Sequence, residues 1–167
     1  MIIWLIGMSG SGKSTIGGEV YSFRKETNQS TVFLDGDNVR DMLKNDADHT
    51  IQGRYKNAER ISNICKFLDN EGIDVVAAVL SIFPEWQDWN RDNFKEYYEI
   101  FLDVPIEELK RRDPKGLYEK AFNGNLKNFV GFDLEFPRPT KSNLVVNESI
   151  MATGVDATVK YILDRLK

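Results

Sequence analysis

The chain has 167 residues, of which 22 are basic and 26 acidic, so its formal net charge is −4 at pH 7. This length suits one ordinary domain, which buries about 70% of the surface that its unfolded chain exposes. The acidic balance disfavours a nucleic-acid-binding scaffold but leaves room for small anionic ligands. The start, MIIWLIGMSG, is too short to span a membrane and lacks the basic lead of a signal peptide, so we expect a cytoplasmic protein without a membrane partner.

Apolar runs alternate with helical patterns along the chain. In chain order, the predicted elements are a strand at 2–7, a helix to about 25, a strand at 31–35, a short Asp-capped helix at 37–43, a helix at 54–71, a strand at 73–80, a helix at 86–97, a strand at 98–104, a helix at 105–112, a strand at 144–147 and a closing helix at 155–166. Strands separated by helices predict an α/β domain, with a parallel sheet and helices on both of its faces. The single cysteine, Cys65, lies among the apolar positions of the 54–71 helix and is expected to be a buried structural thiol.

One segment lacks such a pattern. Residues 122–143 are rich in Asn, Gly and Pro, and they are too many for an ordinary loop in a compact domain. Arg111, Arg112 and Lys115 come just before this segment. In nucleotide kinases a lid with such basic residues closes over the phosphates, and the alternative is a plain charged helix end. We therefore expect a single domain whose lid and acceptor loop span about 110–143.

The most informative motif is GMSGSGKS, residues 7–14, which matches G-x-x-x-x-G-K-[ST] at every fixed position. Its glycines let backbone N–H groups surround a phosphate, and the helix that follows adds its positive N-terminal end. Lys13 is expected to act on the outer phosphates and the Ser14 hydroxyl to bind Mg²⁺. Because the motif stands between a buried strand and a helix, we interpret it as a P-loop that binds ATP. The predicted ATP-binding residues are Gly7, Met8, Ser9, Gly10, Ser11, Gly12, Lys13, Ser14, Thr15 and Arg112.

Two aspartates follow the second predicted strand, in LDGDNVR. The carboxyl ends of parallel strands open onto the ligand crevice, so Asp35 and Asp37 are expected near the γ-phosphate. One carboxylate can hold Mg²⁺ and the other can accept a hydroxyl proton, while Arg40 can bind an anionic acceptor. The alternative is a turn with a helix cap. The catalytic candidates are Asp37, Lys13 and Asp35, and the metal-binding candidates are Ser14 and Asp35; which aspartate is the base stays open.

Several segments together resemble adenylyl-sulfate kinases. They are GMSGSGKST, LDGDNVR, the R-x-x-N of Arg54 and Asn57, RDPKGLYEKA and NFVGFD. The resemblance runs from residue 2 to about 147, and RDPKGLY is far more specific than the P-loop. It implies a P-loop NTPase-type fold and transfer of the ATP γ-phosphoryl to the ribose 3′-hydroxyl of adenylyl sulfate. It also implies Mg²⁺ as cofactor and a homodimer as the typical assembly.

The resemblance assigns roles to the acceptor site. Asp37 resembles the base or metal-positioning carboxylate, and Phe129 resembles one aromatic wall of the base pocket. The residues that resemble binders of the phosphosulfate are Arg40, Arg54 and Asn57, and those that resemble the lid are Lys115, Gly116 and Leu117. The predicted acceptor-binding residues are Asp37, Arg40, His49, Arg54, Asn57, Ser81, Lys115, Gly116, Leu117 and Phe129. Direct transfer needs no phosphorylated serine, so Ser81 stays outside the catalytic set.

The chain departs from the family pattern mainly on the acceptor side. His49 stands where the family has a phenylalanine that stacks on adenine, opposite the aromatic residue matching Phe129. Leu80-Ser81-Ile82-Phe83 replaces Ile-Ser-Pro-Tyr, and Gln87 replaces an arginine. Together with WQDWNR after SIFPE, these differences make the chain similar to cytidine diphosphoramidate kinase, a branch of the family from capsule biosynthesis.

Three hypotheses about function follow. The first is a kinase that phosphorylates the ribose 3′-hydroxyl of a small nucleotide, cytidine diphosphoramidate. The alternative is an adenylyl-sulfate kinase of sulfate assimilation, and a remote one is a non-catalytic nucleotide-binding switch, which intact Lys13, Ser14 and Asp37 disfavour. The imidazole of His49 suits a pyrimidine, because it is smaller than phenylalanine and its nitrogens can form hydrogen bonds. Its usual pKa of about 6.5 would add pH dependence to acceptor binding.

Overall fold

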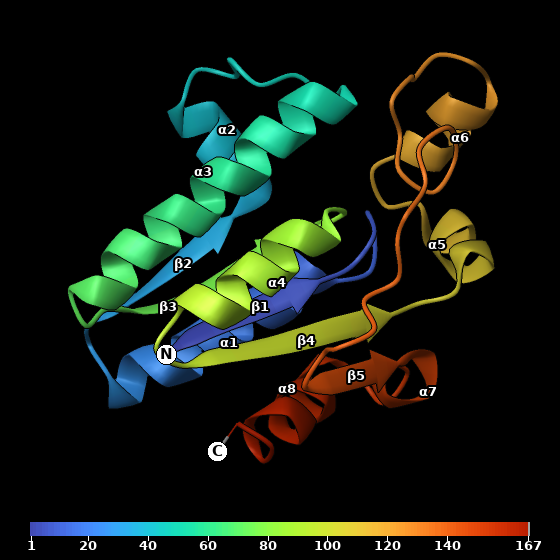
Figure 1. Ribbon diagram of the computed structural model, residues 1–167. Coiled ribbons are helices and arrows are strands. Elements are labelled where there is room, and N and C mark those ends of the chain that lie inside the picture. Colours follow the sequence, from blue (N-terminus) through green and yellow to red (C-terminus); the bar gives the residue numbers. More distant parts are fainter. Residues whose placement is uncertain (167) are drawn as a thin grey trace.

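The computed structural model describes residues 1–166 and has a five-stranded, entirely parallel sheet in the order β2-β3-β1-β4-β5 (Figure 1). The strands are β1 (Ile2–Ile6), β2 (Thr31–Asp35), β3 (Asp74–Val79), β4 (Tyr97–Asp103) and β5 (Leu144–Asn147). The helices are α1 (Lys13–Thr27), α2 (Gly36–Met42), α3 (Ile51–Asn70), α4 (Pro84–Asn93), α5 (Ile106–Arg112), α6 (Leu117–Phe122), α7 (Glu148–Met151) and α8 (Val155–Leu163). The predicted fold class is confirmed.

Alternate residues of the buried central strand β1 serve two separate cores. Ile2, Trp4 and Ile6 face α3 and α4, where they pack with residues such as Cys65. Ile3 and Leu5 face α1 and α8 on the opposite side of the sheet. Figure 1 shows α3 and α4 in front of the sheet and α1 behind it. Apolar side chains on both faces explain the uninterrupted apolar run in the sequence, because a parallel strand covered by helices on both sides has no wet face. Burial raises the pKa of the Cys65 thiol, as expected of a structural cysteine.

Several predicted boundaries were wrong by a few residues. The helix expected at 86–97 begins at Pro84 and ends at Asn93, because Phe94 is extended and Tyr97 already belongs to β4. The long helix begins at Ile51 rather than at residue 54. Its cap is Thr50, whose side chain accepts a hydrogen bond from the Gly53 N–H. The closing helix ends at Leu163 rather than at residue 166.

Two short helices were not predicted, and one predicted cap is a different residue. Helix α6 precedes the long loop, and α7 follows β5 directly. Helix α2 starts at Gly36 and is capped by Asp35, whose carboxylate accepts a hydrogen bond from the Asp37 N–H at 2.9 Å. Such short helices carry too little periodicity to stand out from a sequence.

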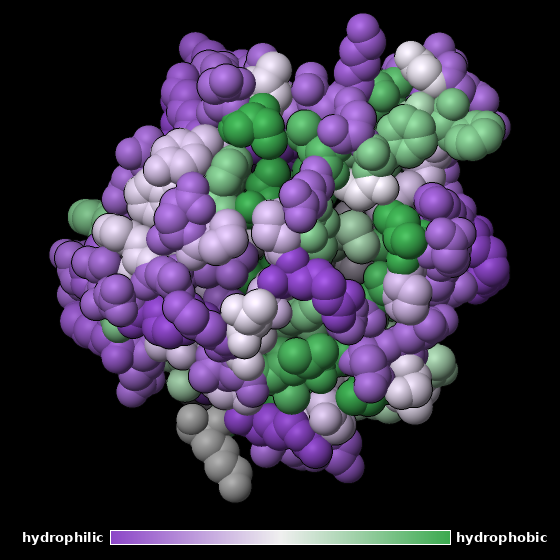
Figure 2. Space-filling view, turned by 45° about the vertical axis from the view of Figure 1, so that its right-hand side comes forward, coloured by the Kyte–Doolittle hydropathy of each residue, from purple (hydrophilic) through white to green (hydrophobic). Residues whose placement is uncertain are grey.

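Helices α5 and α6 and the loop after them lie beyond the carboxyl end of β4 (Figure 1). They enclose a third, smaller core built around Leu109, Tyr118 and Phe129. On the face shown in Figure 2, exposed apolar side chains form separate patches among polar ones. Among residues 1–166, no helix combines the length and apolar character that crossing a membrane requires.

Candidate active site

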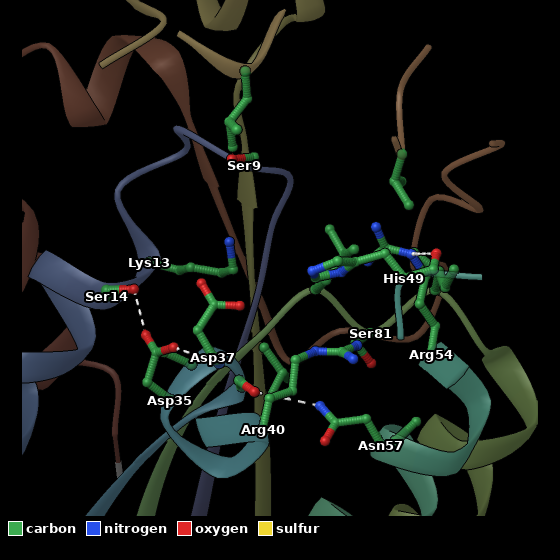
Figure 3. A pocket seen from close by; sticks show the side chains of 18 of the residues that line it. Ser9, Lys13, Ser14, Asp35, Asp37, Arg40, His49, Arg54, Asn57 and Ser81 are labelled. Atoms are coloured by element: carbon green, nitrogen blue, oxygen red, sulfur yellow. Dashed lines mark hydrogen bonds between the residues drawn. The ribbon is translucent and has the colours of Figure 1, made fainter. Parts of the chain in front are cut away.

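A cavity of about 610 Å³ opens at the carboxyl ends of the strands. Its wall includes the P-loop, the turn from β2 into α2, the loop before α3, α3 itself, the turn after β3, the segment 114–117 and residues 126–130. In Figure 3, Lys13 and Ser14 lie on one side of this pocket and His49 and Arg54 on the other, with Arg40 between them. The fold therefore brings residues from distant parts of the chain around one space.

The P-loop forms the turn between β1 and α1. Gly10 and Gly12 have φ angles of 79° and 89°, which glycine adopts at little cost. The Lys13 ammonium donates a hydrogen bond to the Met8 carbonyl at 3.1 Å, so the side chain folds back over the loop. Burial lowers the pKa of Lys13 to about 8, although Asp35 and Asp37 oppose this shift. An anion such as a phosphate stabilises the charged form of this lysine and is favoured there.

Ser14 and Asp35 meet at the mouth of the P-loop. The Ser14 hydroxyl donates to the Asp35 carboxylate at 2.5 Å, and Asp35 keeps this position because it also caps α2. These oxygens suit Mg²⁺, which is bound by one or two protein oxygens while substrate phosphates and water complete its shell. Within residues 1–166, no group of three or more His, Cys, Asp or Glu side chains forms a metal site. The donor set therefore fits a cation that is held jointly with phosphates.

Asp37 lies exposed at the start of α2, next to Lys13 and to the segment between α5 and α6. Lys115 of that segment forms an ion pair with Asp37 at 3.7 Å between Nζ and Oδ2. Both side chains are well exposed, so this pair contributes little to stability. It does bring Lys115 to the cavity wall, close to Lys13 of the P-loop.

Two arginines on the other side of the cavity donate hydrogen bonds to backbone carbonyls. Arg40 is 8% exposed, and its Nη1 donates to the carbonyls of Ala47 and Asp48. Arg54 donates through Nε to the His49 carbonyl at 2.9 Å and through Nη2 to the Asn128 carbonyl at 2.7 Å. Neither guanidinium forms an ion pair within residues 1–166. Two positive charges without a carboxylate partner favour an anionic ligand.

Arg54 joins two segments on either side of the acceptor half of the cavity. One segment carries His49 and the other carries Phe129, and both residues line the cavity. Phe129 is buried and packs edge-to-face on Tyr118, with ring centroids 4.8 Å apart. Burial and the charges of Arg40 and Arg54 lower the pKa of His49. The neutral imidazole is therefore the favoured form at pH 7.

Asn57 is the most enclosed polar residue of this half of the cavity. It is 5% exposed, and its Nδ2 donates to the Gly36 carbonyl at 3.3 Å. Its Oδ1 is buried and has no hydrogen-bond partner within residues 1–166. A buried acceptor without a partner is costly, so this oxygen favours a ligand that donates a hydrogen bond.

The turn after β3 contains a feature that sequence reasoning missed. Ser81 has a φ angle of 52°, which is unusual for a residue other than glycine. The buried Gln87 donates through Nε2 to the Ser81 carbonyl at 2.8 Å, and Trp4 donates through Nε1 to the Ser81 hydroxyl at 3.3 Å. In the sequence, Trp4 is part of an apolar strand, and Gln87 is notable only because the family pattern has an arginine there. Neither position carries a signal that connects it with Ser81.

Most of the predicted site residues line the cavity, and a few do not. Those along its wall are Ser9, Gly10, Gly12, Lys13, Ser14, Thr15, Asp35, Asp37, Arg40, His49, Arg54, Asn57, Ser81, Lys115, Leu117 and Phe129. Gly7, Met8, Ser11, Gly116 and Arg112 are not among the lining residues. The guanidinium of Arg112 donates to Glu108 at 2.6 Å instead, within the helix α5. A role of Arg112 in ATP binding stays a prediction.

Fold and site together define a P-loop phosphotransferase, and its relatives are kinases, which act on a hydroxyl group. The family model of adenylylsulphate kinase matches residues 1–147, and the chain belongs to that family. It is 40% identical over 165 residues to cytidine diphosphoramidate kinase of Campylobacter jejuni, which covers 99% of this chain and 95% of that one. It is 36% identical over 167 residues to adenylyl-sulfate kinase of Clostridium kluyveri, with 99% and 83% covered.

A solved structure shows the same fold in detail. The APS kinase CysC of Mycobacterium tuberculosis, in complex with AMPPNP and APS, has a TM-score of 0.89 and 32% sequence identity to this chain. The match covers 99% of this chain and 96% of that one. The predicted resemblance to this family is thereby confirmed, and the relatives named here are kinases.

Proposed function

We propose that this kinase transfers the γ-phosphoryl group of ATP to the ribose 3′-hydroxyl of cytidine diphosphoramidate. The observation that carries the proposal is that the two sides of the cavity differ in their chemistry. One side has the P-loop with Lys13, and the other side has two guanidinium groups without carboxylate partners. A triphosphate donor suits the first side, and a nucleotide with negative charge on its 5′ side suits the second.

The chain's own residues perform the reaction as follows. The hydroxyl oxygen of the acceptor forms a bond to the γ-phosphorus, the bond from that phosphorus to the β–γ bridging oxygen breaks, and Asp37 accepts the hydroxyl proton. Lys13 stabilises the charge on the transferring group. Ser14 and Asp35 would hold Mg²⁺, which would neutralise phosphate charge when bound. Arg40 and Arg54 hold the acceptor, and the segment of Lys115 closes over both substrates as a lid.

Two observations favour the cytidine acceptor over adenylyl sulfate. The first is the 40% identity to cytidine diphosphoramidate kinase over nearly the whole chain. The second is His49, which lines the same cavity as Phe129, on a segment that Arg54 joins to the segment of Phe129. A neutral imidazole covers less area than a phenyl ring and offers nitrogens to a pyrimidine edge. With this acceptor the enzyme takes part in capsule biosynthesis.

A direct comparison of acceptors tests the proposal. Purified protein with ATP and Mg²⁺ is given cytidine diphosphoramidate or adenylyl sulfate, and ADP release is measured. We expect a higher kcat/KM for the cytidine acceptor, and His49→Phe should shift that ratio toward adenine by about tenfold, the value of one stacking partner. A strong preference of the native protein for adenylyl sulfate would establish the alternative, an enzyme of sulfate assimilation. Tight ATP binding without turnover of either acceptor would indicate a nucleotide-binding switch.

The assembly is a separate proposal. The family resemblance led us to expect a homodimer, and light scattering of the purified protein tests this expectation. A monomer at micromolar concentration that turns over at full rate would show that one chain carries the whole site.

A further inference from the structure

The hydroxyl group of Ser81 lies on the cavity wall with donors on its oxygen. Trp4 is 3% exposed and donates from Nε1 at 3.3 Å, and Gln87, 6% exposed, contributes Nε2 at 3.4 Å. An indole N–H can only donate, and the amide nitrogen of glutamine also only donates. Both groups that donate to the Ser81 oxygen are therefore groups that cannot accept its proton.

The Ser81 hydroxyl can still donate a hydrogen bond through its own hydrogen. Within residues 1–166, Ser81 Oγ donates to no acceptor. The backbone of this turn is itself held in place: the carbonyl of Ser81 accepts from Gln87 at 2.8 Å, and its φ angle of 52° lies in a narrow allowed region. The hydroxyl hydrogen is thus left for an acceptor in the cavity that Ser81 lines.

We infer that Trp4 and Gln87 are positioning residues that orient the Ser81 hydroxyl to donate a hydrogen bond to an anionic oxygen of the acceptor nucleotide. The inference rests on the proposed function, since it assigns the partner of Ser81 within that site. The oxygen belongs to the charged group on the 5′ side of the ribose, because Arg40 and Arg54 draw that group to the same half of the cavity. Ser81 then binds substrate and is not a phosphoryl carrier. A nucleophilic hydroxyl needs a base that takes its proton, and here both groups bonded to the Ser81 oxygen are N–H donors.

The polarity of Gln87 provides a sharp test. Gln87→Glu places a carboxylate where an N–H donor was, so the Ser81 hydroxyl turns to donate to Glu and a negative charge lies near the anionic acceptor. We expect the acceptor KM to rise by about tenfold or more, with the ATP KM unchanged, because charged hydrogen bonds are the strong ones. Ser81→Ala should raise the acceptor KM by roughly three- to tenfold and keep most of kcat.

Two further measurements separate positioning from a merely structural role. In the Ser81→Ala background, Gln87→Glu should have a smaller effect than in the native protein, because the two residues act through one hydroxyl. Trp4→Phe keeps a large aromatic ring but removes the indole N–H, and it should raise the acceptor KM as well. The matched control is Trp89→Phe, in the same core cluster but outside the cavity wall, which should leave both KM values unchanged.

Several outcomes would overturn the inference. They are additive effects of Ser81→Ala and Gln87→Glu, an unchanged acceptor KM in Ser81→Ala, or a phosphorylated Ser81 detected by mass spectrometry after incubation with ATP alone. If neither nucleotide acceptor is phosphorylated, the proposed function fails, and the same variants are compared by calorimetric binding of cytidine 5′-diphosphate. Equal affinity of the native protein and Ser81→Ala would then overturn the inference, and weaker binding by Ser81→Ala would support it.

Discussion

Asp37 and Arg40 sit one turn apart on α2, and their neighbours predict opposite kinetic roles. Asp37 is exposed beside Lys13 and Lys115, whereas Arg40 is buried and holds the loop that carries His49. We expect Asp37→Asn to lower kcat by about 10²- to 10⁴-fold with the acceptor KM changed only a few-fold, as for loss of a general base. Arg40→Ala should act mainly on the acceptor KM, because it removes charge that is present before and during the reaction.

Steady-state kinetics with ATP saturating checks both variants, and thermal melting serves as the control. The Asp37 side chain makes only an exposed ion pair, so Asp37→Asn should have the same Tm as the native protein. A nearly fully active Asp37→Asn enzyme would mean that the aspartate belongs to a turn and an ion pair rather than to the chemistry.

The lowered pKa of His49 sets the pH range in which it can affect binding. Its folded pKa lies below the usual value of about 6.5, because burial and two guanidinium groups disfavour the charged form. The ratio of acceptor KM between the native protein and His49→Phe should therefore be constant between about pH 7 and 8 and change only below about pH 6.5. The same shift makes His49 destabilising in acid, since the unfolded chain binds its proton first as the pH falls. A KM ratio that varies between pH 7 and 8 would contradict this account.

At the scale of elements, the loop before α3 depends on a glycine. A Cβ added to Gly53 would lie 2.2 Å from Asp48 Oδ1 and 2.4 Å from the Asp48 carbonyl oxygen. Asp48 also accepts the hydrogen bonds of Thr50, the cap of α3. We expect Gly53→Ala to displace the loop that carries His49, to lower the free energy of unfolding by about 1–3 kcal/mol, and to raise the acceptor KM more than the ATP KM.

Gly18→Ala is the matched control for this substitution. Gly18 lies inside α1, and nothing stands within 4 Å of an added Cβ. Because alanine favours helix more than glycine does, this change should stabilise the protein by roughly 0.5–1 kcal/mol. Chemical denaturation measures both effects. Equal changes in Gly53→Ala and Gly18→Ala would show that the loop tolerates the added atom.

The same elements explain what could be predicted from the sequence. The five strands and the longer helices followed from apolar runs and periodic patterns, since these are local properties of the chain. Boundaries failed where capping decided them, as at Thr50 and Phe94. The positions of Lys13 and Asp35 followed from their motifs. The Ser81 turn could not be predicted, because its carbonyl is held by a side chain six residues away and its hydroxyl by Trp4 of β1.

At the scale of the whole molecule, one arginine joins α4, β4 and the segment that returns from the long loop. Arg91 donates through Nη2 to the fully buried carboxylate of Glu99 at 3.1 Å and to the Lys141 carbonyl at 3.3 Å. Glu99 also accepts from Tyr97 at 2.7 Å and from Ser142 at 2.8 Å. This network fixes where the loop of the proposed lid rejoins the sheet.

Arg91→Ala should therefore destabilise the fold strongly, because it leaves the buried Glu99 carboxylate without its cation. We expect a loss of about 3 kcal/mol, which is roughly 6–12 °C in Tm for a chain of this size. The control is Lys141→Ala, which removes an ion pair to Asp88 between largely exposed side chains and should cost less than about 1 kcal/mol. Adding Glu99→Gln to Arg91→Ala should recover part of the loss, since the amide needs no cation. If Arg91→Ala and Lys141→Ala melt alike, the buried carboxylate does not depend on Arg91, and the return of the loop must be held by its other contacts.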